Sequence, residues 1–281
     1  MAITNFQRTV WSKKIQTQLD TITSLKDHCN FEFEGEIEYA KEVKILGIQR
    51  PTIRTYVPGT PLTREAGTDS FQLLKIDQFR YFDFEVEDID KAQSTPGLIE
   101  ALTKEATLGL SEEADKYVAS LVADEVTTPT LNVAVGTATD ISGVTDGGIA
   151  LIESGFKKLY ENNCKISDTY HLEINPEWYT ILRPYIIELE TFNTELIKKG
   201  YVGKYGNALI SIENLLGTAT VSSHSCTLAM LRTEKAIAFA GQIDKVEAYR
   251  PHDAFQDALK GLYVFGARIV RPEQLFVFPI Y

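Results

Sequence analysis

Two stretches in the first third of the chain alternate between apolar and acidic residues, and this pattern constrains the fold more than any other feature. In residues 31–46, apolar side chains fall on one side and five glutamates on the other. Residues 72–87 repeat the pattern, with Phe82, Phe84 and Val86 on one face and Asp83, Glu85 and Glu87 on the other. Because successive side chains of a β-strand point to opposite faces, both stretches are predicted strands.

Residues 47–70 lie between these strands and predict an irregular tip. They are punctuated by Pro51, Pro58, Gly59, Pro61 and Gly67. Two strands joined by such a tip form an extended β-hairpin, which is marginally stable by itself in water. The hairpin therefore predicts a neighbouring surface to lie on. Basic residues concentrate along it, so we expect acidic faces elsewhere to receive it: Lys41, Lys44, Arg50, Arg54, Arg64 and Lys75.

The acids of residues 83–90 could instead form a metal site or an acid–base site. Side chains on one face of a strand recur every ~7 Å, which is twice the rise per residue. Metal ligands converge on one ion at about 2–2.5 Å. We therefore favour a solvated or interface face for Asp83, Glu85 and Glu87, and we predict neither a metal site nor a catalytic residue there.

A long helix follows the second strand. Ser94 or Thr95 can cap it, Pro96 suits its first turn, and apolar residues recur at threes and fours to about Glu125. Roughly thirty residues at about 1.5 Å each give ~45 Å, which is long for a globular protein. Gly109 interrupts the pattern and is interpreted as a bend or a close crossing.

The rest of the chain mixes helices and strands without a regular βαβ rhythm, which predicts an α+β fold. We expect strand and loop over 127–148, a helix over 149–162, a strand at 170–176, a helix from 177 that is kinked or ended at Pro184, a further turn over 191–199, strands within 207–215 and 226–240, and three strands within 246–281.

No motif in the chain demands a cofactor. Residues 200–208 contain spaced glycines but lack the phosphate-loop spacing, so they are interpreted as a turn from helix to strand. Residues 142–148 could offer backbone amides to an anion, although a flexible loop is favoured. Ser223, His224 and Cys226 are close in sequence, but neighbours on a strand point apart and do not form a nucleophile–base pair.

The histidines and cysteines are interpreted as structural. His28, His171, His224 and His252 show no metal-ligand spacing. The cysteines, Cys29, Cys164 and Cys226, are far apart and odd in number, which fits a reducing cytoplasm and small buried side chains. We expect no secretory signal, because the first residues lack an apolar run, and no membrane span, because no eighteen consecutive residues are apolar.

The net charge of −11 argues against a protein that reads nucleic acid, which normally carries a basic stripe. It does not exclude a protein that encloses nucleic acid without gripping it. Residues 1–29 have the spacing of an amphipathic arm that carries Phe6 and Trp11. Such an arm would favour a partner surface.

The order of these elements resembles the major capsid (coat) protein of tailed bacteriophages, which has the Hong-Kong-97-type fold. Residues 73–94, "LLKIDQFRYFDFEVEDIDKAQS", look like the return strand of the hairpin and the acidic lead into the long helix. Residues 195–216, "ELIKKGYVGKYGNALISIENLL", resemble the helix, glycine turn and strand of phage capsid chains. Residues 232–278 resemble their closing segment. The resemblance covers residues 30–278, and the ordered set carries it.

The resemblance implies a division of the chain into the parts of that fold. Residues 1–30 would be the N-terminal arm, and residues 31–87 the extended hairpin, or E-loop, with its strands. Residues 88–130 would form the peripheral domain with its spine helix, and residues 244–281 would close that domain. Residues 131–243 would form the axial domain, which gathers at the five-fold and six-fold vertices.

The resemblance also implies the function and the partners. The chain would assemble with itself into pentamers and hexamers of an icosahedral virion capsid, in the cytoplasm of a bacterial host. The shell would enclose double-stranded DNA without sequence-specific binding. A separate scaffolding protein, a portal and decoration proteins are expected partners, and no enzyme activity is expected. Candidate subunit contacts are Phe6, Trp11, Arg50, Arg54, Arg64, Glu85 and Glu87.

Two other functions stay open at this point. An encapsulin-like compartment shares the fold but encloses enzymes instead of DNA, so the contents of purified particles would distinguish it. A small soluble α/β hydrolase would use the acids of 83–90 and would turn over substrate as a monomer.

Overall fold

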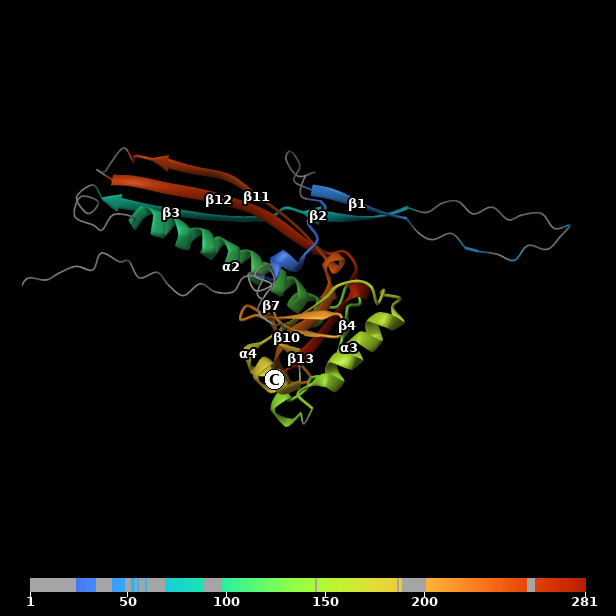
Figure 1. Cartoon of the computed structure of the whole chain (residues 1–281). Helices are drawn as coiled ribbons and strands as arrows, with labels where there is room; N and C mark the ends of the chain where they lie inside the picture. Colours follow the sequence, from blue (N-terminus) through green and yellow to red (C-terminus); the bar gives the residue numbers. More distant parts are fainter. Residues whose placement is uncertain are drawn as a thin grey trace, which may run out of the picture.

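The computed structural model describes residues 24–33, 42–48, 52, 53, 55, 59, 69–87, 98–144, 146–185, 187–188, 201–251 and 256–281. Three parts are visible in Figure 1. A layer of long strands lies along one long helix, a two-stranded hairpin extends to one side, and a body of shorter strands and helices lies below.

The hairpin consists of β1 (Glu42–Ile48) and β2 (Asp69–Lys75), which pair antiparallel. Glu42 lies opposite Lys75 and Ile48 opposite Asp69. The predicted hairpin is confirmed at residues 42–46 and 72–75, but its strands also run through 47, 48, 69 and 70, which were predicted to belong to the irregular tip. Residues 34–41 and most of the tip, 49–68, lie outside the described part of the chain.

The second predicted strand is wrong as one continuous strand, because it breaks at Ile76 and Asp77. Its second half, β3 (Gln78–Glu87), pairs with β12 (Gln256–Ile269) instead of with the hairpin. The reason for the break is a close crossing: the carbonyl of Lys75 lies 2.0 Å from the position that a Cβ on Gly266 would take.

The long strands form a sheet in the order β11-β12-β3, with β11 at Ile237–Tyr249. Helix α2 (Leu98–Thr127) is 30 residues long, as predicted, and contacts β3 and β12. The prediction of a close crossing at Gly109 is wrong, since a Cβ there would meet no heavy atom within 4 Å beyond its own helical turn. The proposed capping residues 94–96 lie outside the described part.

The body contains a larger sheet, which in the described residues runs in the order β4-β13-β10-β5-β8-β7-β6, with β9 paired to β10. Its strands are β4 (Ala134–Val135), β5 (Tyr170–Ile174), β6 (Ile187–Glu188), β7 (Tyr201–Tyr205), β8 (Ala208–Ile212), β9 (Thr218–Val221), β10 (His224–Thr233) and β13 (Leu275–Ile280). The body helices are α3 (Ile149–Glu161) and α4 (Pro176–Leu182). Short 3-10 turns occupy Lys26–His28, Ile141–Gly143, Arg183–Tyr185, Glu234–Ala236 and Pro272–Gln274.

The central strands of this sheet are buried on both faces. On β10, Leu228 and Met230 face a core shared with α2, whereas Ala229 and Leu231 face a core shared with α3 and α4. On β13, Leu275 and Val277 face the core shared with α2, whereas Phe276, Phe278 and Ile280 face the other core. Strands covered on both sides read as continuous apolar runs, which explains the sequences "TLAMLR" and "LFVFPI".

Most predicted elements of the body are confirmed, and one turn differs. α3, β5 and the three closing strands match, and α4 ends at Leu182, two residues before Pro184. The interpretation of 200–208 as a helix-to-strand turn is wrong, because β7 begins at Tyr201 and returns through Gly206 to β8. Gly206 has a φ of +57°, which a tight hairpin turn favours.

Residues 146–148, at the end of the stretch interpreted as a flexible loop, form a packed turn that leads into α3. Gly147 and Gly148 have φ of +68° and +86°, and Cβ atoms there would collide with Tyr185 and Trp178. Trp178 Nε1 donates a hydrogen bond of 3.0 Å to the Gly147 carbonyl. Asp146 accepts hydrogen bonds from the amides of Gly148 and Ala150, so the chain's own carboxylate occupies the suggested anion position.

Candidate functional site

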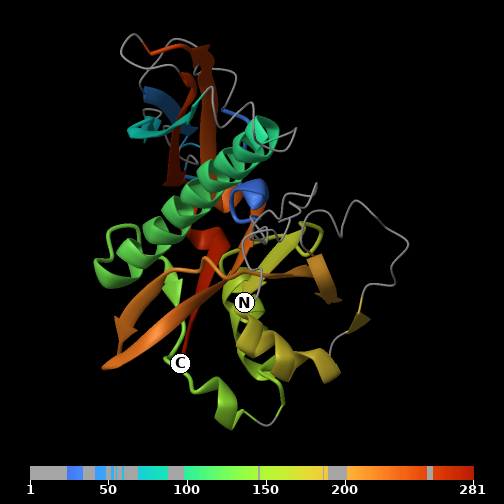
Figure 2. The same ribbon diagram turned by 90° about the vertical axis from the view of Figure 1, so that its left-hand side faces the viewer.

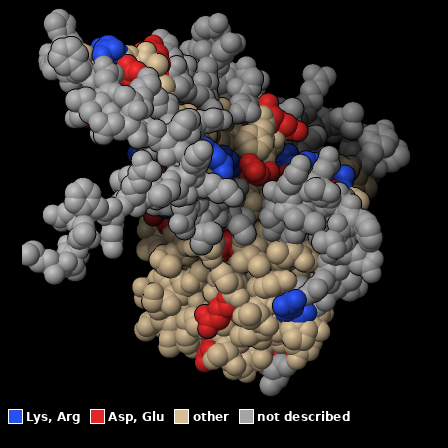
Figure 3. All heavy atoms as spheres, turned by 60° about the vertical axis from the view of Figure 1, so that its left-hand side comes forward, with Lys and Arg blue, Asp and Glu red and all other residues tan. Residues whose placement is uncertain are grey.

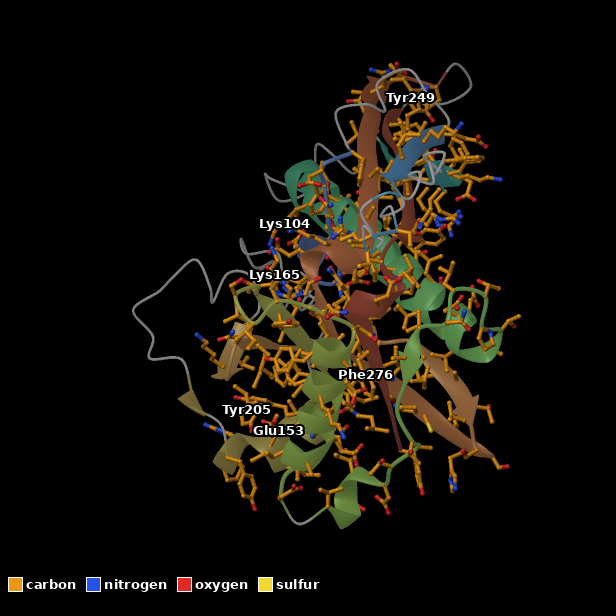
Figure 4. All side chains as sticks on the ribbon, turned by 90° about the vertical axis from the view of Figure 1, so that its right-hand side faces the viewer. Lys104, Glu153, Lys165, Tyr205, Tyr249 and Phe276 are labelled. Carbon is orange, nitrogen blue, oxygen red and sulfur yellow. The ribbon has the colours of Figure 1, made fainter. Side chains whose placement is uncertain are left out.

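The acids of β3 lie along an exposed face and bond across the sheet. Tyr249, at the far end of β11 (Figure 4), donates a hydrogen bond of 3.0 Å to Asp83. This bond raises the pKa of Tyr249. Gln256 donates to Glu85 in the same way. These carboxylates therefore bond to separate cross-strand partners, and among the described residues no group of three His, Cys, Asp or Glu side chains is arranged so that it could hold a metal ion.

The predicted contact residues are placed only in part. Glu85 is exposed on β3, and the backbone of Glu87 ends that strand opposite Gln256. Phe6, Trp11, Arg50, Arg54 and Arg64 lie outside the described residues. Their role in subunit contacts therefore stays a prediction.

The hairpin has one covered face and one exposed face. Val43 and Leu74 are paired and buried on the inner face. On the outer face, Leu46 and Phe71 are paired and are 70% and 56% exposed. Lys44 holds its Nζ 4.0 Å from the centre of the Phe71 ring. An exposed apolar pair of this kind suits contact with another surface.

The outer face of β3 carries a second exposed apolar pair. Phe79 and Tyr81 are 57% and 77% exposed and share the strand face of Asp83 and Glu85. The sequence reading passed over them because it followed the acidic half of the alternation. Phe79 and Tyr81 are at odd-numbered positions, as Asp83 and Glu85 are. Because alternate residues of a strand share one face, the sequence could have predicted that these two aromatic side chains are exposed.

The base of the hairpin is held firmly on the long sheet. Gln72 donates to the Val270 carbonyl at 3.1 Å, and Arg268 donates to the Leu73 carbonyl at 2.9 Å. Leu74 and Ile76 pack with alanines of β11. A cavity of about 480 Å³ remains beside this joint, between β2, β12 and the second half of α2.

Residues 24–30, called the clip below, lie against α2 between the two sheets, as the blue segment in Figure 2 shows. Leu25 is fully buried in the core beneath α2. Asp115 of α2 accepts hydrogen bonds from the amides of Leu25 and Lys26, at 3.3 and 2.9 Å. At its end, Asn30 bonds to the backbone of Ile237 and Phe239.

A buried guanidinium holds the other side of the clip. Arg232 of β10 donates to the carbonyls of Leu25 and His28, at 2.7 and 2.9 Å. It also makes a bidentate pair with Glu173 of β5, at 2.6 and 3.0 Å. His28 Nδ1 lies 2.8 Å from Glu173, and the His28 ring stacks on His171. A buried ion pair needs such additional bonds to offset its desolvation.

The pKa values of this cluster are strongly shifted. Burial would raise the pKa of Glu173, but Arg232 and His28 together lower it to about 2. Burial raises the pKa of Asp115 to about 6. Burial, reinforced by the charges of Glu173 and Asp115, raises the pKa of Glu213 to about 9. Burial also raises the pKa of the Cys29 thiol to about 11.

Sequence reasoning placed His28, His171 and Cys29 as structural residues, and the described geometry agrees, but it missed the acids and the arginine around them. The available signal was a charge inside an apolar strand: Glu173 in "YHLEI" and Arg232 in "LAMLRT". Charged residues are seldom fully buried unless they are paired.

The surface of the body differs from that of the long sheet. One face of the body displays few charged side chains (Figure 3). Glu153 of α3 and Tyr205 of β7 lie close together on the side of the body that Figure 4 shows. Tyr205 donates a hydrogen bond of 2.7 Å to Glu153, and this bond raises the pKa of Tyr205 to about 12. In the part of the chain that is described, none of the helices has both the length and the apolar character of a membrane span.

No protein-family model and no curated protein matches the sequence. Solved structures do match. A chain of Mycobacterium phage Che8 is 28% identical, with a TM-score of 0.77, and the match covers 99% of this chain and 98% of that one. The capsid structure of the cyanophage P-SCSP1u is 17% identical, with a TM-score of 0.75, over 99% and 93% of the two chains.

A virus-like particle from Pyrococcus furiosus matches less well, with 13% identity, a TM-score of 0.53 and 91% of each chain covered. The match to phage capsid structures extends over nearly the whole chain. The chain therefore has the α+β fold of phage capsid proteins, and the predicted resemblance to tailed-phage major capsid proteins is confirmed.

Proposed function

We propose that this chain is the major capsid protein of a tailed phage, and that it assembles into an icosahedral shell of pentamers and hexamers around double-stranded DNA. The observation that carries this proposal is the end-to-end structural match at 28% identity to a chain of a mycobacterial phage. The match covers 99% of this chain and 98% of that one.

The parts of the molecule take their roles from this proposal. Residues 1–30 act as the N-terminal arm and 31–87 as the E-loop with its strands. Residues 88–130 and 244–281 form the peripheral domain, in which α2 is the spine helix, and 131–243 form the axial domain, to whose sheet the closing segment adds β13. β3 belongs to residues 31–87 and β12 to residues 244–281. Their pairing in one sheet supports the joining of these two segments.

Contacts between copies supply the stability that the hairpin lacks. Leu46 of β1 and Phe71 of β2 are exposed on the outer face of the hairpin, and we infer that a neighbouring copy covers them. Burial of such side chains contributes about 1.5–3 kcal/mol each. The predicted contacts through Phe6, Trp11, Arg50, Arg54 and Arg64 would add to this surface, together with Glu85 and Glu87.

We propose no enzyme activity and no cofactor for this chain. Its expected partners are further copies, a scaffolding protein, a portal and decoration proteins, and assembly would take place in the host cytoplasm. The encapsulin-like alternative is not favoured, because structures of phages match nearly the whole chain.

Electron microscopy of the expressed protein, together with its size-exclusion mass, tests the proposal. We expect closed shells, or rings of five and six subunits, and DNA inside particles purified from the producing cell. Packaged enzymes in place of DNA would support the compartment instead. A 31.5 kDa monomer that never assembles, even with lysate of its source, would overturn the proposal.

A paired substitution locates the contact. Leu46→Ser with Phe71→Ser should abolish assembly and leave the circular dichroism of the chain unchanged. Ile166→Ser is the matched control, because Ile166 is 67% exposed on the body. Equal loss of assembly in both variants would contradict the assignment of the hairpin face.

A further inference from the structure

The clip closes over an unbalanced group of buried charges. Three carboxyl groups, from Asp115, Glu173 and Glu213, lie around the clip together with the guanidinium of Arg232, and all four residues are at most 1% exposed. If all three carboxyl groups were ionised, they would outnumber Arg232 and a protonated His28, the side chain that bonds to Glu173. A surplus of charge away from water is costly, so the site favours a neutral form of at least one acid.

The hydrogen bonds identify which acid is neutral. Glu173 receives the bidentate Arg232 pair, and Asp115 receives two amides of the clip. Glu213 Oε1 accepts from the Ser24 hydroxyl, whereas its Oε2 is buried and has no hydrogen-bond partner in the described structure. Glu213 therefore gains least from being ionised.

We propose that the clip closes with a proton on Glu213, which makes the clip a proton-dependent latch that opens as the pH rises. Opening moves Ser24 away and lets water reach the Glu213 carboxyl group. The carboxyl group then loses its proton, because an ionised carboxylate is stable in water. The latch belongs to the fold of one chain and is independent of the proposed shell function.

The sign of the effect follows from the shifted pKa of Glu213. In the closed state it is raised from the ordinary 4.5 to about 9 by burial and by the Glu173 and Asp115 charges. A group whose pKa is raised in the closed state stabilises that state. Its contribution is complete when the pH is below the ordinary pKa, and it is lost as the pH rises to the raised pKa. In that range the opening constant should rise about tenfold per pH unit.

The groups that face Glu213 come from each element around it: Ser24 and Asp27 of the clip, Asp115 of α2, Glu173 of β5 and Arg232 of β10. His28, which bonds to Glu173, stacks on His171, and His171 lies 3.5 Å from Glu234. Lys26 bonds to Ser111. Asp115, with a pKa of about 6, and Glu173, with a pKa of about 2, both titrate below neutrality. Between pH 7 and 9, Glu213 therefore dominates over these two acids.

Labelling of cysteine measures the opening directly. Cys29 is 4% exposed, and its thiol donates to the Leu25 carbonyl inside the clip. Cys226 is fully buried on β10 and serves as an internal reference. The full-length chain is labelled with a thiol-reactive disulfide, each site is quantified by mass spectrometry, and each rate is divided by that of the denatured chain at the same pH.

We expect the normalised Cys29 rate to rise about tenfold per pH unit between pH 7 and 9, while the Cys226 rate stays constant. Glu213→Gln should remove the rise, because an amide cannot ionise. The exposed Glu153→Gln should behave like the natural sequence. A Glu213→Gln chain with an unchanged rise, a natural chain without a rise, or a parallel rise at Cys226 would each overturn the latch.

Ser24→Ala provides a second variant that leaves the acids in place. It removes the hydroxyl donor to Glu213, so opening should increase at every pH while the dependence on pH is retained. Loss of the pH dependence in this variant would also overturn the proposal.

Discussion

The body sheet and the long three-stranded sheet bury their strands in different ways. Every residue of β13 is buried, since one core lies on each side of the strand. On β3, Phe79, Tyr81, Asp83 and Glu85 are all exposed. The body is thus stable through its own packing, whereas the long sheet and the hairpin keep an unburied face. The surfaces that we propose for contact with other copies therefore lie on the extended parts of the chain.

The buried charges of the body give the largest expected effect. Arg232→Met leaves Glu173 buried without its cation, and we expect a loss of about 3–5 kcal/mol in the free energy of unfolding. Urea denaturation measures this loss. Arg271→Met, at an exposed position, is the control and should change stability by less than ~0.5 kcal/mol. A small effect of Arg232→Met would mean that the body does not depend on this pair.

Acid should destabilise the body through the same pair. The folded pKa of Glu173, about 2, lies below its ordinary 4.5, so its stabilising contribution is present above pH 4.5 and is lost as the pH falls toward 2. We expect the midpoint of thermal unfolding to decrease across this range. In Glu173→Gln with Arg232→Met the decrease should be smaller, and an identical acid profile in that double variant would contradict the assignment.

The same substitution, glycine to alanine, should have opposite effects on stability at Gly266, in the long sheet, and at Gly109, on α2. Gly266→Ala forces a Cβ against the Lys75 carbonyl where the hairpin crosses the long sheet, and we expect a loss of about 1–3 kcal/mol. Gly109→Ala, in open space on α2, should stabilise the chain by about 0.5–1 kcal/mol. Thermal unfolding of both variants tests this. A change in stability of the same sign in both variants would contradict the close crossing at Gly266.

The elements that the sequence predicts best are those with a clear local period. Strands predicted within 31–46 and 72–87, the long helix to about Glu125 and the closing strands all have counterparts in the structure, although their bounds differ by several residues. The break at Ile76 escaped prediction, because it depends on Gly266, nearly two hundred residues later in the chain. Periodicity reports which faces are apolar, but not which strand will cover them.

The candidate site was harder to predict for the same reason. The acids of β3 were correctly placed on an exposed strand face by their parity. The clip instead depends on side chains from α2, β5 and β10 that meet only in three dimensions. Asp115 looks like an ordinary helical acid in the sequence, and its two bonds to the clip follow from tertiary packing.

The smallest expected effect is on the outer face of the long sheet. Lys260 lies 3.2 Å from Glu247 and 5.0 Å from the Tyr249 ring, and both members of the ion pair are about half exposed. Water and salt screen such a pair, so Lys260→Ala should cost about 0–1 kcal/mol in the unassembled chain. Urea denaturation at low and high salt measures this cost. A loss well above ~1 kcal/mol would show that this face already stabilises the single chain, and the contrast between a body packed on both sides and an extended sheet with a free face would then fail.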